Sequence, residues 1–196
     1  MADTFNAPRT VIMSKIKKGK PQLEPLPDVP MYSFAGDKHD SFKQNLVSFD
    51  GEFEEFASRE EAINYLRTKL DASKKIFSSV SDYDGTIHLS DFKTPHDAHV
   101  VDICVTEGIV GVAETGSVWL TDKSLQLAAA ALLSTDMFVL LDKSKIEGSM
   151  HEAYATINLR DTSYGAFYTG PSATADIEAV HITGAQGEIS LTVLLY

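Results

Sequence analysis

The chain has 196 residues, of which 43% are hydrophobic and 23% are charged, a balance that is ordinary for a globular protein that buries its own core. The formal net charge of −11 argues against binding to nucleic acid and against docking on anionic membranes, because both need a basic face. No apolar run approaches the roughly 20 residues of a membrane span, and the first residues lack the pattern of a signal peptide, so we expect a cytoplasmic protein.

The N-terminal segment differs in composition from the rest of the chain. Four prolines fall within the eleven residues Lys20–Pro30, and such a stretch is extended because proline fixes φ and lacks a backbone donor. We predict an extended N-terminal arm over residues 1–35 and a single domain over residues 36–196. The one dense basic patch, with lysines at positions 15, 17, 18 and 20, fits a short solvated tail; a polyanion contact is the alternative.

After the arm, helical and strand patterns alternate. Ser58 followed by Glu61 is a capping box, which predicts a helix whose apolar face holds Ala62, Ile63 and Leu66. The other expected elements are a helix from near residue 40 to residue 50, strands at 52–56, 75–80, 100–105, 109–114, 117–120 and 137–141, a helix at 143–156, a loop leading into a short helix at 170–179, and a terminal strand at 190–195. The alternation predicts an α/β fold with a largely parallel or mixed sheet.

One segment near the C-terminus combines turn residues, hydroxyls and carboxylates. It contains Gly170, Pro171, Ser172, Thr174, Asp176 and Glu178. The glycine and proline predict a sharp turn, either hydroxyl can cap the helix that follows, and the two carboxylates suit the first turns of that helix. A structural role explains all of this. Alternatively, the free amides of the helix start and the two hydroxyls bind a carboxylate or a phosphate.

A second segment places a carboxylate beside a glycine bend. Glu114 ends one predicted strand, and Thr115-Gly116 form a bend or bulge before the next. In α/β folds, residues at strand ends often belong to ligand sites, so Glu114 is a candidate general base or nucleophile. A hydrogen-bonded or solvated glutamate at a strand end fits the same pattern.

Several kinds of site have no support in the sequence. There is no glycine-rich phosphate loop, no dinucleotide-binding glycine motif and no nucleophile elbow. The single cysteine, Cys104, lies in an apolar run and is expected to be a buried hydrophobe, so this chain alone cannot hold a four-thiolate iron–sulfur cluster. His96 and His99 flank Asp97-Ala98 in what reads as a polar loop, and we expect no metal site there.

Two motifs resemble those of a known family. Gly170–Glu178 resembles the Gly-Pro-Ser-x-Thr-x-Asp-Ile-Glu signature of the LUD (lactate utilization) domain, and Ala113–Ser117 is similar to the Ala-Glu-Thr-Gly-Thr/Ser element of that family. The resemblance covers about residues 40–196. The family commonly continues with Gly-x-His-Gly-Pro, whereas this chain has Gln186 in place of the histidine and Glu188 in place of the proline. Because glutamine cannot carry a proton near neutral pH, any acid–base step of that histidine is in doubt here.

The resemblance implies an open sheet with flanking helices, similar to the NagB/ribose-5-phosphate isomerase/CoA-transferase group. It implies a non-redox component of a system that oxidises L-lactate to pyruvate, with no cofactor in this chain and iron–sulfur clusters on partner proteins. Glu114 would act on a small carboxylate ligand, with Thr115, Gly116, Gln186 and the signature residues lining the site. Two alternatives stay open, a stand-alone CoA-transferase- or cyclo-ligase-like enzyme and a ligand-binding regulatory module.

Overall fold

The computed structural model describes residues 6–21, 24–25, 27–28, 30, 34–175, 178, 180 and 182–196. The chain divides into two units, Met1–Tyr32 and Ser33–Tyr196. In the first unit, Asn6–Lys18 form helix α1, so the prediction of an extended arm is wrong for these residues. The helix ends with three lysines, which suit the negative end of its dipole. The described residues of Lys20–Pro30 form neither helix nor strand.

The second unit is built on a five-stranded sheet in which all neighbours run parallel. Its strand order is β1-β11-β6-β3-β2. The strands are β1 (Glu52–Glu55), β11 (Ser190–Leu195), β6 (Asp136–Leu141), β3 (Ile103–Glu107) and β2 (Ile76–Ser78). The three inner strands are almost entirely buried, as their Val-, Leu- and Ile-rich sequences predict for strands covered on both faces. The edge strand β1 is instead largely exposed.

Side-chain alternation along these strands gives the sheet two apolar faces. On one face, Ile103, Phe138 and Leu194 pack against helix α3 (Arg59–Lys69), which contributes Ala62, Ile63 and Leu66. On the other face, the apolar side chains of the same strands pack against α2, α4, α5 and a second sheet. The helices on this side are α2 (Lys38–Ser48), α4 (Asp122–Leu125) and α5 (Ala128–Leu133).

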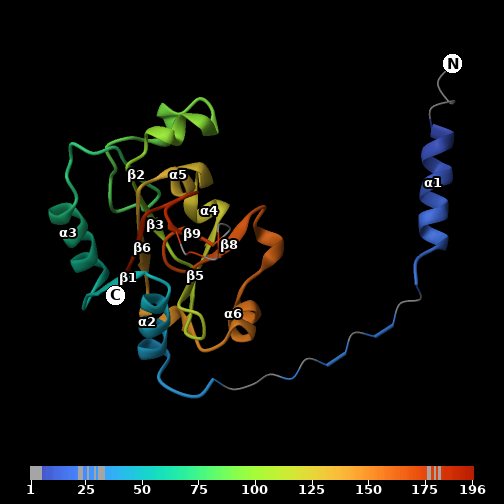
Figure 1. The fold of residues 1–196 in the computed structure, drawn as a ribbon, viewed down its shortest axis with the longest axis horizontal. Coiled ribbons are helices and arrows are strands. Elements are labelled where there is room, and N and C mark those ends of the chain that lie inside the picture. The colour runs from blue at the N-terminus through green and yellow to red at the C-terminus, as the bar shows by residue number, and fades with distance from the viewer. Residues whose placement is uncertain are drawn as a thin grey trace. The chain divides into compact units, whose positions relative to one another are not determined.

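The second sheet has four strands, in the order β7-β4-β5-β8. They are β7 (Ile146–Glu147), β4 (Val110–Val112), β5 (Ser117–Thr121) and β8 (Gly165–Tyr168). Its outer face carries Trp119 and Val112, which pack with Ala153 of helix α6 (Met150–Thr156). Within this unit, Figure 1 shows α3, the parallel sheet, the second sheet and α6 as successive layers.

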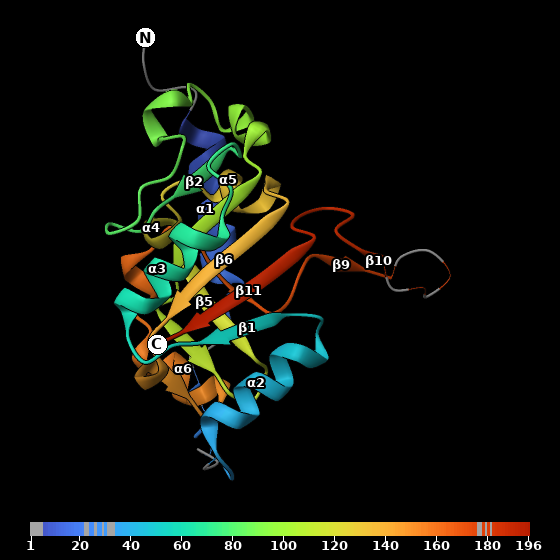
Figure 2. The same ribbon diagram turned by 90° about the vertical axis from the view of Figure 1, so that its left-hand side faces the viewer.

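Short elements complete the unit. A two-stranded antiparallel hairpin, β9 (Ala173–Thr174) with β10 (Ile182–Thr183), projects from the rest of the unit (Figure 2). The 3-10 helices η1 to η4 connect the larger elements; they span Leu89–Asp91, Pro95–Val100, Lys143–Lys145 and Leu159–Asp161. Of the described residues, none belongs to a helix long and apolar enough to cross a bilayer.

Most predicted elements are confirmed. Ser58 caps α3 by accepting from the backbone N–H of Glu61, and the predicted strands up to β2 and at β6 and β11 lie where the patterns placed them. The strand predicted at 100–105 begins later, because Pro95–Val100 form η2. The helix predicted over 143–156 is wrong in its first half, where η3 and β7 precede an α6 capped by Ser149. The α/β class and the open sheet with flanking helices are confirmed.

The packing of α3 on the sheet makes a testable prediction about stability. Leu194 is fully buried, so Leu194→Ala leaves a cavity and should lower the free energy of unfolding by about 3 kcal/mol. Leu159→Ala is the matched control, because that leucine is 56% exposed and its truncation should cost less than about 0.5 kcal/mol. Urea denaturation followed by circular dichroism measures both changes, and equal losses would contradict the assigned core.

Candidate functional site

The two motifs found in the sequence meet in the structure. Strand β5 pairs antiparallel with β8 so that Val118 opposes Tyr168, which places Ser117 beside Thr169 at the ends of the pair. The Ser117 hydroxyl donates to Thr115 Oγ1 at 2.6 Å, and its oxygen lies 2.5 Å from Thr169 Oγ1. A chain of three hydroxyls therefore joins the turn after β4 to the turn after β8.

Both motif glycines pack against the backbone of α2 and the residues that follow it. Gly116 has φ of +66°, and a Cβ built on it would lie 2.2 Å from the backbone nitrogen of Leu46. Gly170 has φ of +64°, and its Cβ would lie 1.9 Å from the carbonyl oxygen of Phe49. Asn45 of α2 completes this junction by donating to the carbonyl oxygen of Ala113 at 2.7 Å. The two glycines are required here by conformation and by space.

Glu114 lies on the solvent side of this junction. Its side chain is exposed, and Oε2 accepts from the backbone N–H of Met150 at 2.8 Å, in the first turn of α6. Glu114 also donates its own backbone N–H to the carbonyl oxygen of Gly148. Glu114 thus connects the turn between β4 and β5 to the start of α6 through two hydrogen bonds. Its expected role as a base or nucleophile stays a prediction.

The segment after Gly170 differs from the expectation. Ala173–Thr174 form strand β9, so the described part of this segment does not contain the predicted helix or its anion-binding start. The Ser172 N–H donates to the carbonyl oxygen of Glu188 at 3.0 Å, and the Ser172 carbonyl oxygen accepts from Gly184. The sequence pattern could not show this hairpin, because its partner strand lies beyond the turn.

The remaining predicted residues do not gather at one point. Pro171 is buried next to Gly170, whereas Glu178 and Gln186 are exposed, and Glu178 has φ of +55°. Asp176 lies outside the described residues. The structure therefore brings Thr115, Gly116, Gly170 and Pro171 into one packed junction with Glu114 at its surface. The binding roles assigned to all of these residues stay predictions.

The junction lies at the amino ends of parallel strands. Gly170 approaches Gly51, which directly precedes β1, and Ser172 is bonded to Glu188, two residues before β11 begins. Glu114 follows β4, which belongs to the second sheet. Ligands of open α/β sheets bind outside the carboxyl ends of the parallel strands, and Glu114 does not lie at that edge.

Glu188 is a buried carboxyl group that sequence reasoning did not select. Only 4% of the residue is exposed, and burial raises the pKa of its carboxyl above the usual range. After the larger effect of burial, its charge also helps to raise the pKa of Cys104 and of Tyr168, whose hydroxyl lies 3.2 Å from that of Tyr164. The one sequence feature that could have indicated this buried carboxyl group is the glutamate at a position where the family motif has proline.

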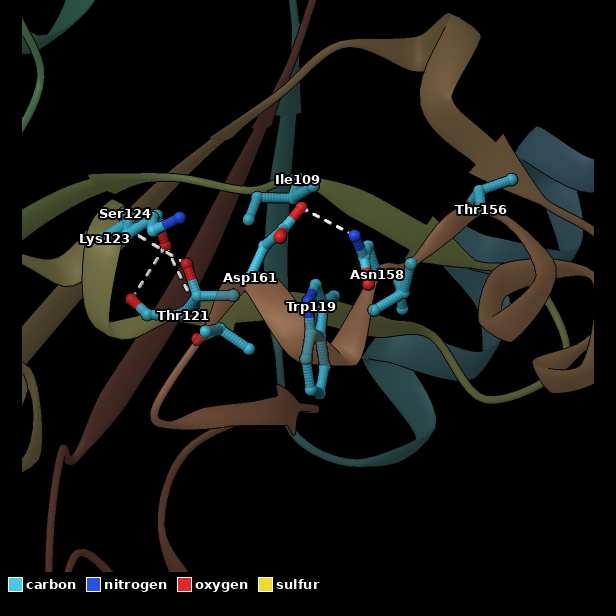
Figure 3. A pocket seen from close by; sticks show the side chains of 10 residues that line it. Ile109, Trp119, Thr121, Lys123, Ser124, Thr156, Asn158 and Asp161 are labelled. Atoms are coloured by element: carbon cyan, nitrogen blue, oxygen red, sulfur yellow. Dashed lines mark hydrogen bonds between the residues drawn. The ribbon is translucent and has the colours of Figure 1, made fainter.

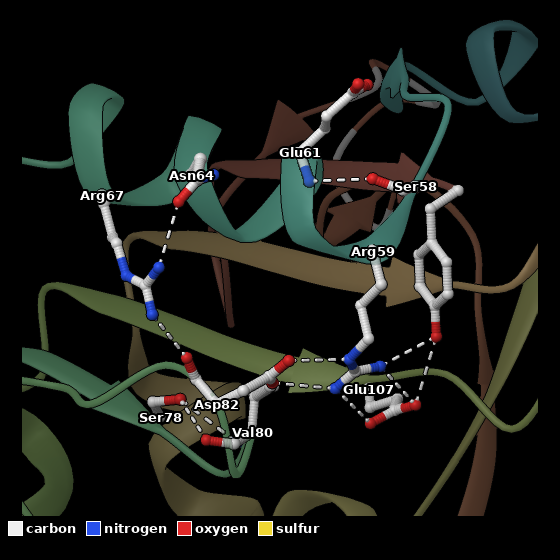
Figure 4. Close-up of polar contacts among 10 residues, drawn as sticks. Ser58, Arg59, Glu61, Asn64, Arg67, Ser78, Val80, Asp82 and Glu107 are labelled. Atoms are coloured by element: carbon white, nitrogen blue, oxygen red, sulfur yellow. Dashed lines mark hydrogen bonds and ion pairs between the residues drawn. The ribbon is translucent and has the colours of Figure 1, made fainter.

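The carboxyl ends of the parallel strands carry a network centred on Arg59 (Figure 4). From the first turn of α3, its guanidinium binds Asp82 through Nε at 2.9 Å and Nη2 at 3.0 Å, and Glu107 through Nη1 at 2.9 Å and Nη2 at 3.1 Å. Nη1 also donates to the hydroxyl of Tyr196 at 2.8 Å. Arg59 therefore ties together the ends of β3 and β11 and the turn after β2.

The electrostatics of this network follow from its hydrogen bonds. The side-chain bonds from Arg59 hold the pKa of Asp82 below its usual range, and those from Asp82 and Glu107 raise the pKa of Arg59. For Tyr196, burial is the largest influence and raises the pKa of its hydroxyl. Local sequence patterns do not indicate this network, because its members come from four separate segments of the chain.

A cleft lies at the outer face of the second sheet (Figure 3). It has a volume of about 460 Å³; Trp119, Ile109 and Ile157 give it apolar walls, and Asn158 and Asp161 lie at its polar side. Asn158 Nδ2 donates to Asp161 Oδ2 at 2.7 Å. Neither motif contributes to this cleft.

The part of the chain that the structure describes contains no group of three or more histidines, cysteines, aspartates or glutamates placed to hold a metal ion. Cys104 is fully buried, and burial raises the pKa of its thiol to about 12. At neutral pH the thiol is therefore protonated and inaccessible, which suits a packed side chain rather than a metal ligand or a nucleophile.

Comparison with known proteins gives the family. The model of the LUD domain matches residues 80–196, which is more than half of the chain and includes both motifs. The chain belongs to the LUD domain family. This family is associated with lactate utilization. No curated protein matches the sequence.

A solved structure supports the fold of this LUD domain. A DUF162 family protein from Deinococcus radiodurans superimposes with a TM-score of 0.64 at 12% sequence identity, over 81% of this chain and 95% of that one. At this identity the likeness concerns the fold alone. The structural likeness reaches beyond residues 80–196, which the family model matches, because 81% of the chain is longer than that range.

The junction predicts a specific effect of adding one methyl group. Gly170→Ala should lower the free energy of unfolding by more than about 2 kcal/mol, because the new Cβ meets the carbonyl oxygen of Phe49 in a strained left-handed conformation. Gly36→Ala is the control: it shares a positive φ of +125°, but its Cβ has no neighbour nearer than 3.8 Å. If urea denaturation shows that both variants lose the same free energy of unfolding, the positive φ and not the close contact with Phe49 explains the need for glycine at position 170.

The Arg59 network predicts a pH dependence of stability. The folded pKa of Asp82 is lowered, so its contribution is present at pH 7 and is lost as the pH falls through that folded value, below 3.8. Asp82→Asn should therefore lower the free energy of unfolding at pH 7, by less than about 1 kcal/mol for this partly exposed pair, and the difference should vanish in acid. Asp84→Asn, at an exposed position in the same turn, should show no such difference at either pH.

Proposed function

We propose that this chain is the non-redox component of a system that oxidises L-lactate to pyruvate, acting with partner proteins that carry iron–sulfur clusters. The family association with lactate utilization supports the reaction. The observation that supports placing the redox centres on partner proteins is the single cysteine of this chain, Cys104, which is fully buried. A cluster held by cysteine needs several thiolates, so such clusters belong on other chains.

The chemistry of the reaction fits this division. Conversion of L-lactate to pyruvate breaks the C2–H and O–H bonds, forms a C2=O bond, and releases two electrons and two protons. Iron–sulfur clusters on the partner proteins would supply the acceptor for these two electrons. This chain contributes binding and positioning of the small carboxylate, which are tasks for hydrogen-bond donors and cations rather than for a redox centre.

The finer likeness to the NagB/ribose-5-phosphate isomerase/CoA-transferase group remains part of this proposal. The parallel sheet and its flanking helices are compatible with it. In such a sheet the polar groups at the carboxyl ends of the strands, with Arg59 at their centre, have the position expected of a ligand-binding edge. The family match and the sheet topology support this part of the proposal.

Affinity purification from the native host, grown on L-lactate, tests the proposed function. The tagged chain should recover partner proteins with iron and the broad visible absorption of iron–sulfur clusters, and deletion of its gene should abolish growth on L-lactate. Cys104→Ala should restore growth and recover the same amount of iron, because the buried thiol binds no cluster. Purification without any cluster-bearing partner, or loss of iron in the Cys104→Ala variant, would contradict the proposal.

A further inference from the structure

A second cleft opens at the carboxyl ends of three neighbouring parallel strands. It has a volume of about 280 Å³, and its walls include Ser79 after β2, Glu107 at the end of β3 and Lys145 after β6. This is the edge at which open α/β sheets bind ligands. The volume suits a small organic acid, and neither motif found in the sequence contributes a residue to it.

Two lysines give this cleft a positive character on a protein whose net charge is −11. Lys123 lies in the first turn of α4 and Lys145 ends η3, and both line the cleft. Among the described residues, neither amino group lies within 4.0 Å of a carboxylate oxygen. Both cations are therefore available to an anionic ligand that enters between the two loops.

Among the described residues, Glu107 is the one carboxylate that lines the cleft, and it is already paired. Arg59, which is not among the residues that line the cleft, binds both of its oxygens, at 2.9 Å and 3.1 Å, and so offsets the negative charge of Glu107. Oε1 also accepts from the Tyr196 hydroxyl at 3.4 Å, whereas Arg59 is the one donor to Oε2 among the described residues, so Oε2 keeps a lone pair that can accept a hydrogen bond from a ligand hydroxyl. The cleft thus combines two cations for a carboxylate with one acceptor for a neighbouring hydroxyl.

We propose that this cleft binds a 2-hydroxycarboxylate, an inference that rests on the proposed function and names its substrate site. The carboxylate of the ligand binds Lys123 and Lys145, and its 2-hydroxyl donates to Glu107. A 2-oxo acid has no hydroxyl proton, so its carbonyl oxygen would face the Glu107 carboxylate without a hydrogen bond. The site therefore distinguishes L-lactate from pyruvate and favours the substrate over the product.

Isothermal titration of the full chain tests this site with L-lactate, pyruvate, propionate and lactamide. L-lactate should bind most tightly; pyruvate and propionate should bind about tenfold more weakly, because they lose the bond to Glu107, and the uncharged lactamide should not bind measurably. Lys123→Ala and Lys145→Ala should each raise the Kd for L-lactate about tenfold. Lys93→Ala is the matched control, because Lys93 is exposed and lies outside the cleft, and it should leave the Kd unchanged.

Three results would overturn the inference: no L-lactate binding up to about 10 mM, which is tenfold above the usual range of KM values; equal affinities for L-lactate and propionate; or lysine variants that bind like Lys93→Ala while unfolding at the same denaturant concentration as the wild type. Recovery of iron–sulfur partners is measured separately. Partners without L-lactate binding would leave the proposed function in place and remove this site, whereas L-lactate binding without partners would do the reverse.

Discussion

The backbone of α2 is the surface on which the two glycine-containing turns close. Gly116 approaches the helix at Leu46, and Gly170 approaches the segment that follows it at Phe49. These contacts hold the ends of β5 and β8 at the place where Ser117 and Thr169 meet. Because β8 leads into the hairpin and then into β11, the same contacts set where the last strand enters the parallel sheet.

The sequence predicts what depends on local pattern. The Ser58 cap and the apolar strand Ser190–Leu195 are encoded in adjacent residues, and both are found as predicted. In the segment expected to be a loop leading into a short helix at 170–179, the described residues Ala173–Thr174 form strand β9, because a run of capping residues also suits a hairpin turn and only the pairing of β9 with β10 decides between them. The Arg59 network could not be foreseen, since its partners are far apart in the chain and meet only when the strands align.

Family motifs and ligand chemistry occupy opposite ends of the parallel strands in this interpretation. The motif junction lies at the amino ends, beside Gly51 and Glu188, where Gly116 and Gly170 pack closely against α2 and the residues that follow it. The lysine-lined cleft lies at the carboxyl ends, in segments that no motif marks. A family signature can thus consist of residues that the packing of the fold requires. Ligand specificity can depend instead on short loops that lie outside the signature.

The exposed edge of the parallel sheet has its own consequence. Strand β1 presents Glu52, Glu54 and Glu55 along a row of backbone groups on its outer side, and it is only four residues long. An unpaired strand edge invites another chain to add a strand, and like charges repel an identical edge that approaches it. Lys43 pairs with Glu55 at 3.1 Å, so the carboxylates of Glu52 and Glu54 supply the repulsion that disfavours self-association through extension of the sheet at this edge.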